Sequence, residues 1–256
     1  MTQKTFILVH GAWVGEWCFD PIIPLLKAKG HTALAISLTG FGQKRHLHSP
    51  NISILDHIRD VVEFVESRDL QTISLVGHSY GGGVITGAWD QLRERVRELF
   101  FIDATTPANG ESHFDNMIRY GGEGQIKAIF GKVMASGETM RSFPIGALRR
   151  QDPEKAAYLQ DKVMPQPIKC FTTPIHFVNG PLPPYIAKTF ILSAKNQGYH
   201  QNQAKEIHAD SSWRYFEIDT YHDAMYEDPT GLVEILTLPT NNPLNSSNRI
   251  INRGTK

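Results

Sequence analysis

The stretch Ile73-Ser74-Leu75-Val76-Gly77-His78-Ser79-Tyr80-Gly81 decides the fold of this chain of 256 residues. Its apolar first half is typical of a buried strand, and residues 82–96 follow as a helical segment. A serine with glycines two positions before and after it, at a turn from strand to helix, matches the G-x-S-x-G elbow. The strained turn lifts the serine hydroxyl off the edge of the sheet. We therefore expect Ser79 to act as a nucleophile.

Apolar, β-branched runs alternate with longer amphipathic segments on both sides of this stretch. Near-continuous apolar strands separated by helices are typical of a parallel sheet that is covered on both faces. The expected fold class is therefore α/β, with a mostly parallel central sheet. The expected strands are residues 6–9, 33–36, 73–76, 99–102, 190–192 and 214–218, and the expected helices include residues 19–29, 54–67, 82–96 and 230–236.

The alternation stops between residues 106 and 185, where glycines, prolines and short helical patterns dominate. Apolar side chains such as Phe114, Met117 and Phe130 favour a folded, mainly helical cap over a disordered loop, and a cap inserted here could cover the site. We expect a core formed by residues 1–105 and 186–239, and a cap formed by residues 106–185. Residues 240–256 are polar and aperiodic and are expected to be a disordered tail.

Composition narrows the classes of function. The 26 basic and 26 acidic residues balance, which argues against a nucleic-acid surface. No stretch is long and apolar enough for a membrane span or a signal sequence, so we expect a cytoplasmic protein that is not bound to a membrane. The two cysteines, Cys18 and Cys170, are expected to be free and buried. The expected partner is a small-molecule substrate; the oligomeric state stays open, with a homodimer among the alternatives.

A serine nucleophile needs a base and donors for the oxyanion. His222 follows the last expected strand, at the sheet edge where catalytic groups collect, and is the expected base. The expected donors are the backbone N–H groups of Tyr80, directly after the serine, and Ala12, in the turn after the first strand. His113, at the start of the expected cap, is expected to lie at the surface, with contact to the substrate as the alternative.

No two histidines have the helical H-x-x-x-H spacing of a metal site, and the two cysteines are too few for a cysteine-rich zinc site. We therefore expect no metal and no organic cofactor.

Four motifs together resemble the α/β-hydrolase superfamily, and in particular small bacterial esterases related to plant methylesterases and hydroxynitrile lyases. The motifs are Val9-His10-Gly11-Ala12-Trp13, Leu38-Thr39-Gly40-Phe41-Gly42, Gly77-His78-Ser79-Tyr80-Gly81-Gly82 and His222-Asp223-Ala224-Met225. The resemblance extends over most of the expected core and is weak across the cap. It implies the α/β-hydrolase fold and the chain order serine, acid, histidine.

The acid is the open position of the expected triad. The resemblance implies an aspartate after the strand at 190–192, but Asn196 stands near that place, and an asparagine cannot supply the negative charge that stabilises an imidazolium. Asp103, at the end of the strand at 99–102, also satisfies the chain order and is the favoured acid, with Asn196 as the alternative third member. Asp219 and Asp223 lie too close to His222 in sequence to be preferred.

The favoured function is a serine hydrolase that cleaves a small, mostly apolar ester, lactone or thioester through an acyl-enzyme. A lyase of the hydroxynitrile-lyase type is an alternative. The resemblance implies a lysine directly after the catalytic histidine and a threonine in the oxyanion turn for such lyases, where this chain has Asp223 and Gly11. A binding protein or receptor on a hydrolase fold is the third possibility, and the doubtful acid is its only support.

Overall fold

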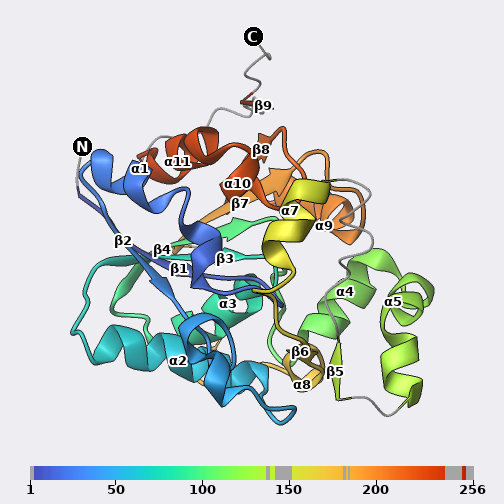
Figure 1. Cartoon of the computed structure of the whole chain (residues 1–256). Helices are drawn as coiled ribbons and strands as arrows, with labels where there is room; N and C mark the ends of the chain where they lie inside the picture. Colours follow the sequence, from blue (N-terminus) through green and yellow to red (C-terminus); the bar gives the residue numbers. More distant parts are fainter. Residues whose placement is uncertain are drawn as a thin grey trace.

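A seven-stranded, wholly parallel sheet forms the centre of the computed structural model, which describes residues 3–136, 139–141, 152–180, 183, 185–239 and 250–251 (Figure 1). The strand order is β2-β1-β3-β4-β7-β8-β9, and each neighbouring pair runs parallel. The strands are β1 (Thr5–Val9), β2 (Thr32–Ile36), β3 (Ile73–His78), β4 (Val96–Ile102), β7 (Ala187–Ser193), β8 (Trp213–Ile218) and β9 (Ile250–Ile251).

The side chains of each central strand alternate between two apolar layers. In β1, Ile7 and Val9 join one buried cluster, whereas Phe6 and Leu8 join the other. Successive side chains of a strand point to opposite faces, so a strand that is apolar throughout is buried on both. Helices α2 (Ile54–Glu66), α3 (Gly81–Gln91) and α9 (Tyr199–Ala209) contribute to the first cluster, and α1 (Ile23–Ala28), α10 (Ala224–Glu227) and α11 (Pro229–Thr237) contribute to the second. The expected α/β-hydrolase fold is confirmed.

Two expected helices differ from the structure for local reasons. The segment 19–29 is divided into a short 3-10 helix, η1 (Glu16–Phe19), and α1, because Pro21 interrupts the backbone donors between them. The helix expected over 82–96 ends at Gln91, since the chain turns through Leu92 and begins β4 at Val96.

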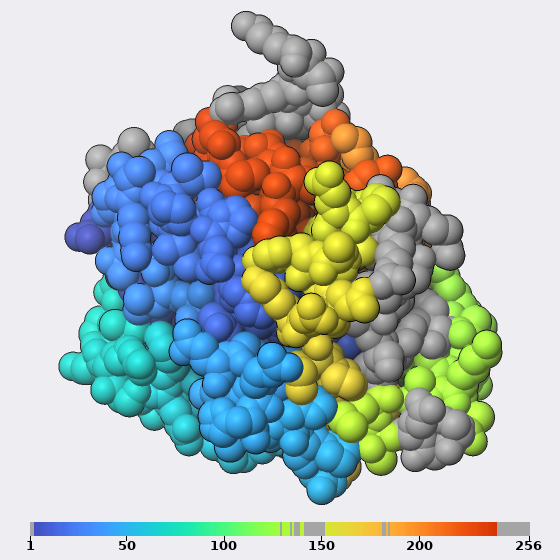
Figure 2. Space-filling model, in the orientation of Figure 1, coloured from blue at the N-terminus to red at the C-terminus, as the bar shows by residue number. Residues whose placement is uncertain are grey.

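The chain between β4 and β7 is the segment expected to form the cap, and it is called the cap region below. Its described elements are α4 (His113–Gly121), α5 (Glu123–Ser136), β5 (Met140–Arg141), α7 (Pro153–Leu159), β6 (Gln166–Pro167) and α8 (Lys169–Thr172). In Figure 2 residues 152–180, in yellow, lie across the face shown, between N-terminal and C-terminal parts of the core. The division into core and cap stays a prediction, and parts of the segment lie outside the described residues.

Of the expected tail, the structure describes only Ile250 and Ile251, which pair as β9 with Glu217 and Ile218 of β8. An outer strand presents unpaired N–H and C=O groups, and two β-branched residues suit a short strand that pairs with them. The other tail residues lie outside the described part of the chain. Among the described helices, none has the length and apolarity that crossing a lipid bilayer requires.

The close approach of α3 to the elbow gives a stability prediction. A Cβ atom at Gly77 would lie 2.6 Å from the carbonyl oxygen of Gly81 and 2.8 Å from the backbone nitrogen of Gly82, so Gly77→Ala should destabilise the protein by about 1–3 kcal/mol. Gly131, inside α5, is the matched control, because nothing lies within 4 Å of its Cβ position. Gly131→Ala should stabilise by about 0.4–1 kcal/mol. Urea unfolding of both variants measures this; equal stabilities would contradict the close approach.

Candidate active site

Ser79 lies at the turn between β3 and α3 with a left-handed backbone, at φ 54°. A non-glycine residue adopts this conformation at a cost and keeps it only where neighbours fix it. Three backbone hydrogen bonds do so. The Ser79 N–H donates to the Ile102 carbonyl at 3.1 Å, and the Ser79 carbonyl accepts from Gly82 N at 3.1 Å and Thr105 N at 3.2 Å. The serine is therefore fixed between β3, α3 and the loop after β4.

His222 and Asp103 form a hydrogen-bonded pair at the same edge of the sheet. The Nδ1 of His222 lies 2.6 Å from Oδ2 of Asp103. Asp103 follows β4 and is fully buried, whereas the His222 side chain is 34% exposed. A buried carboxylate that accepts from one ring nitrogen fixes the tautomer of the ring and leaves the other nitrogen free to take a proton.

The pKa values of the pair shift in opposite directions. Burial alone lowers the pKa of His222, but the hydrogen bond and negative charge of Asp103 outweigh it and hold this pKa above its ordinary value of 6.5. For Asp103, burial raises the pKa, while His200, His222 and Asn196 lower it, with a net shift below its ordinary value. Asp103 is therefore ionised at neutral pH, and its charge favours the imidazolium form of His222.

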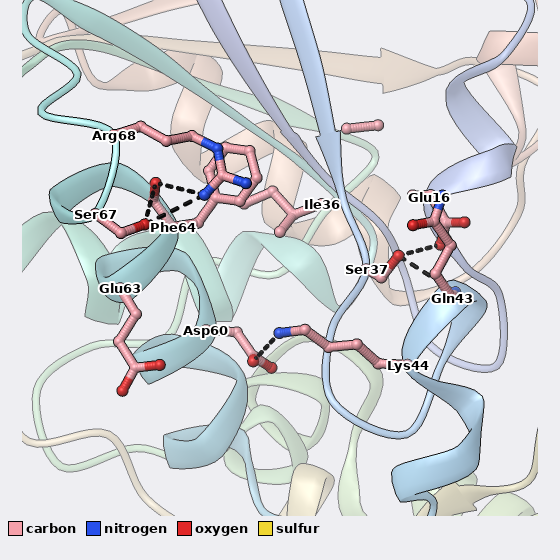
Figure 3. Close-up of a pocket in the computed structure, with 11 residues that line it drawn as sticks. Glu16, Ile36, Ser37, Gln43, Lys44, Asp60, Glu63, Phe64, Ser67 and Arg68 are labelled. Atoms are coloured by element: carbon pink, nitrogen blue, oxygen red, sulfur yellow. Dashed lines mark hydrogen bonds and ion pairs between the residues drawn. The ribbon is translucent and has the colours of Figure 1, made fainter.

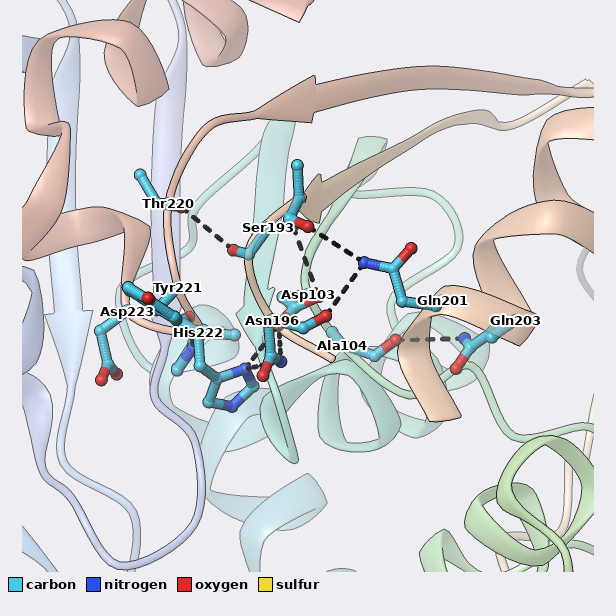
Figure 4. A network of polar contacts seen from close by, with 12 residues as sticks. Asp103, Ala104, Ser193, Asn196, Gln201, Gln203, Thr220, Tyr221, His222 and Asp223 are labelled. Atoms are coloured by element: carbon cyan, nitrogen blue, oxygen red, sulfur yellow. Dashed lines mark hydrogen bonds and ion pairs between the residues drawn. The ribbon is translucent and has the colours of Figure 1, made fainter. Parts of the chain in front are cut away.

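Asn196 contacts both members of the pair (Figure 4). Its Nδ2 donates to Asp103 Oδ2 at 2.5 Å and lies 3.2 Å from His222 Nδ1. The two residues considered for the third position of the triad are thus neighbours in space. Asp103 provides the charge, and Asn196 donates a hydrogen bond to that carboxylate.

The turn after β1 lies against the elbow. A Cβ atom at Gly11 would lie 3.0 Å from Nδ1 of His78 and 3.1 Å from Cβ of Ser79, which is tighter than ordinary van der Waals contact, so glycine lets the two turns approach without a shift. Ala12 and Tyr80 are buried, and within the described part of the chain neither backbone N–H donates a hydrogen bond. Buried N–H groups are almost always paired, so two unpaired ones beside a serine are a notable exception. They can donate to a developing oxyanion.

His10 fixes the orientation of this turn from the core. Burial lowers the pKa of His10 to about 3, so the ring is neutral. Its Nε2 accepts from Leu38 N at 3.2 Å, and its Nδ1 therefore carries the proton and donates to the Gly11 carbonyl at 2.8 Å. The N–H and C=O of a trans peptide point in opposite directions, so holding the Gly11 carbonyl also directs the Ala12 N–H.

Two further histidines flank His222. His78 lies 4.7 Å away between ring centres and donates from Nε2 to the His222 carbonyl at 2.9 Å; His200, in α9, lies 5.5 Å away. Burial lowers the pKa of both to about 4. Asp103, His200 and His222 each offer a ligand atom, and these atoms lie within 4.8 Å of one another. This set suits a zinc-type ion, but metal binding would have to displace the hydrogen bond between Asp103 and His222.

His113 is buried, with 3% of its surface exposed, so the expectation of a surface position is wrong. It lies at the start of α4, where its Nδ1 is 3.0 Å from Thr105 Oγ1. Its ring lies 5.4 Å from Tyr80 and 5.3 Å from Phe171. Apolar neighbours from other elements cover it, and the sequence around His113 does not show them.

Phe171 of α8 is the centre of an aromatic cluster beside the site. Its ring centre lies 5.7 Å from Trp13, 6.0 Å from Tyr80 and 5.1 Å from Phe130. Tyr80 is held in place in turn, because its hydroxyl donates to Nδ1 of His57 at 2.9 Å and Nε2 of His57 donates to the Thr39 carbonyl. The cluster thus connects the cap region to Trp13, in the turn after β1, and to Tyr80, directly after Ser79.

A cavity of about 450 Å³ opens beside His222 and has a charged lining. Lys155 of α7 pairs with Asp223 at 2.5 Å within it. The full lining is Asp152, Lys155, Lys195, Asn196, Gln197, Tyr221, His222, Asp223 and Glu227. One side of the site is therefore polar, whereas the cluster around Phe171 is aromatic.

A second cavity, of about 420 Å³, lies between β2 and α2 (Figure 3). Its polar groups bond to one another: Lys44 pairs with Asp60 at 2.5 Å, and Ser37 donates to Glu16 at 2.7 Å. Neither Ser79 nor His222 lines it. This cavity therefore contributes neither the serine nor the histidine of the candidate active site.

A parallel sheet that carries a serine at such a turn defines the class of α/β hydrolases. The sequence profile of the Alpha/beta hydrolase family matches residues 6–235, and the chain belongs to this family, which confirms the resemblance inferred from the motifs.

Two curated relatives are esterases by name. The carbendazim hydrolyzing esterase of Nocardioides sp. (strain SG-4G) is 44% identical over 110 residues, which are 43% of this chain and 46% of that protein. The putative chloroplastic methylesterase 13 of Arabidopsis thaliana is 35% identical over 114 residues, 44% of this chain and 26% of that protein. The chain thus spans less than half the length of these relatives.

Solved structures agree on the fold. An extracellular alpha/beta-hydrolase from a Paenibacillus species matches with a TM-score of 0.77 and 22% identity, over 91% of this chain and 97% of that one. The methylesterase MES16 from Arabidopsis matches with a TM-score of 0.70 and 24% identity, over the same shares. At these identities the likeness concerns the fold alone.

The contact between Asp103 and His222 gives a prediction for activity and its pH dependence. Asp103→Asn should lower kcat roughly 10⁴-fold, because the neutral amide cannot stabilise the imidazolium. Wild-type activity should rise with pH through an ionisation above 6.5, since His222 must be neutral to accept a proton and its pKa is raised. Asp103→Asn should move this ionisation to lower pH. Profiles of kcat/KM against pH measure both effects.

Asn196→Ala is the control, with a much smaller loss and a nearly unchanged ionisation, because it removes a neutral donor. The double variant Asp103→Asn with Asn196→Asp should regain part of the lost activity, since position 196 also lies within 3.2 Å of His222 Nδ1. A larger loss for Asn196→Ala than for Asp103→Asn would assign the third position to Asn196.

Proposed function

We propose that this protein is a serine hydrolase that cleaves a carboxylic ester through an acyl-enzyme, with Ser79 as nucleophile, His222 as base and Asp103 as acid. The observation that carries the proposal is the 2.6 Å contact between His222 and a fully buried carboxylate, at the same sheet edge as a serine with a left-handed backbone. Membership of the α/β-hydrolase family supports the same reaction class.

The reaction would follow from this geometry in two halves. His222 takes the hydroxyl proton as Ser79 attacks the ester carbonyl, and the N–H groups of Ala12 and Tyr80 donate to the oxyanion that forms. His222 then gives its proton to the leaving alcohol. In the second half His222 takes a proton from the water that attacks the acyl-enzyme, and it then returns a proton to Oγ of Ser79 as the acid is released. Asp103 keeps its negative charge throughout and stabilises each imidazolium.

The substrate class follows from the two sides of the site. The aromatic cluster around Phe171 supports a flat apolar group on one side of the scissile bond, and the charged cavity beside His222 supports a polar group on the other. The names of the relatives, a carbendazim hydrolyzing esterase and methylesterases, support small esters of this kind. We propose methyl and other small alkyl esters that carry an aromatic group, with carbendazim as one compound to test.

The competing functions have less support. Asp223 follows His222 and pairs with Lys155, which gives the position a negative charge where the resemblance implies a lysine for hydroxynitrile lyases. The binding-protein alternative depended on a missing acid, and Asp103 lies within hydrogen-bond distance of His222.

Replacing the proposed nucleophile or base should abolish hydrolysis. Ser79→Ala and His222→Ala should each lower kcat by about 10⁴-fold or more, because members of a triad act as a unit. Hydrolysis of p-nitrophenyl acetate and labelling of Ser79 by a fluorophosphonate measure this, with circular dichroism to check the fold. Turnover within about tenfold of wild type in either variant would refute the mechanism. If the wild-type protein binds an ester but is not labelled by the fluorophosphonate, a receptor would be favoured.

Buried apolar residues of the cap region should set substrate preference. Phe130→Ala and Met117→Ala each remove a buried apolar side chain of the cap region, and they should change the ratio of kcat/KM between aromatic and aliphatic methyl esters by about 10–200-fold. Labelling of Ser79 should persist. Met225→Ala removes a buried side chain on the opposite face of the sheet and serves as control. An unchanged substrate ranking in the two cap variants would exclude the cap region from specificity.

A further inference from the structure

A segment of the cap region, residues 164–166, crosses the turn that carries Ala12. Two hydrogen bonds join this segment to Trp13. The Trp13 N–H donates to Oε1 of Gln166 at 3.0 Å, and the Met164 N–H donates to the Trp13 carbonyl at 2.9 Å. The partners are about 150 positions apart in sequence, so only the folded cap region brings them together.

Trp13 needs such support because its backbone is left-handed, at φ 66°. A bulky residue with a positive φ is strained and persists only where its surroundings fix it. The turn holds this conformation directly beside Ala12, whose N–H is one of the two unpaired donors next to Ser79.

The two peptide groups on either side of the Ala12 Cα are held by different parts of the molecule. The Gly11–Ala12 peptide is held through its carbonyl by His10, which belongs to the core. The Ala12–Trp13 peptide is held through its N–H by Gln166, which belongs to the cap region. With both peptide planes fixed, the direction of the Ala12 N–H is fixed as well.

The Gln166 side chain is buried next to the turn that carries Trp13. It is 1% exposed, and its Nε2 has no acceptor among the described residues. A buried amide with an unpaired donor carries a free-energy cost that an apolar residue of similar size would avoid. Oε1 of Gln166 accepts from the Trp13 N–H, and the side chain also lies beside the Cys170 thiol, whose pKa it acts to lower against the larger effect of burial.

We propose that Gln166 is a positioning residue of the oxyanion hole, so that the cap region completes the catalytic geometry as well as covering the site. This inference rests on the function proposed above. Loss of the Gln166 oxygen removes this acceptor from the Trp13 N–H, the turn relaxes from its left-handed conformation, and the Ala12 N–H no longer points at the oxyanion.

Two variants of Gln166 separate the hydrogen bond from packing. Gln166→Met keeps the length of the side chain and places a methyl group where the oxygen lies. It should lower kcat about 10–100-fold. This is less than the 10²–10³-fold loss that follows removal of a whole oxyanion donor, because the Ala12 N–H is misdirected and not removed. KM should stay within about threefold, since the contact matters in the transition state. Gln166→Glu keeps an oxygen acceptor in either protonation state, and its kcat should return to within about fivefold of wild type.

His48→Ala is the matched control. The Nε2 of His48 donates to the Pro165 carbonyl at 2.7 Å, so this variant removes another hydrogen bond to the same segment without touching Trp13. Its kcat should stay within about threefold of wild type. The three variants are compared with wild type by steady-state kinetics on one methyl ester. The thermal midpoint of each variant shows whether its fold is intact.

The proposal fails if Gln166→Met keeps kcat within threefold, if Gln166→Glu loses as much as Gln166→Met, or if His48→Ala loses as much as either. Failure of the underlying function looks different, because Ser79→Ala would then keep its activity and wild type would not react with a fluorophosphonate.

Discussion

Ser79 has a left-handed backbone, which a serine adopts only where its neighbours hold it in place. Much of the site is arranged around this turn. The left-handed turn requires Gly77 to lie against the start of α3 and ties the serine to Ile102 and Thr105, at the end of the neighbouring strand. That strand ends in Asp103, which is itself left-handed, at φ 43°. The nucleophile and the carboxylate are thus placed by adjacent strands of one sheet, and their separation depends little on loops.

Electrostatics around this turn are simple because burial suppresses most of the possible charges. His10, His57, His78, His113 and His200 all have pKa values lowered to about 3 or 4 by burial and remain neutral. Where both ring nitrogens have partners, as in His10 and His57, the tautomer is defined. His222 is the exception, because Asp103 raises its pKa. One histidine can therefore gain and lose a proton near neutral pH while its neighbours serve as fixed donors and acceptors.

Local patterns were sufficient for much of the fold and for part of the site. The apolar runs predicted six of the seven strands, since a strand buried on both faces is apolar throughout. Ser79 and His222 were predicted from their places after strands, because the carboxyl ends of parallel strands meet at one edge. Helix α9 and the two-residue β9 were not predicted, as neither has a strong periodic pattern, and the ends of α1 and α3 depended on Pro21 and on the start of β4.

The sequence by itself determined that a serine stands at a strand-to-helix turn and that a histidine follows the last long strand, because strand and turn propensities are local. Only the tertiary structure shows that Asp103 and Asn196 both lie beside His222, since Asp103 is 119 positions away from His222 in the sequence. The same holds for the burial of His113, the cluster around Phe171 and the contact of Gln166 with Trp13. These contacts depend on how the cap region packs on the core, and packing between distant segments leaves no pattern in either segment alone.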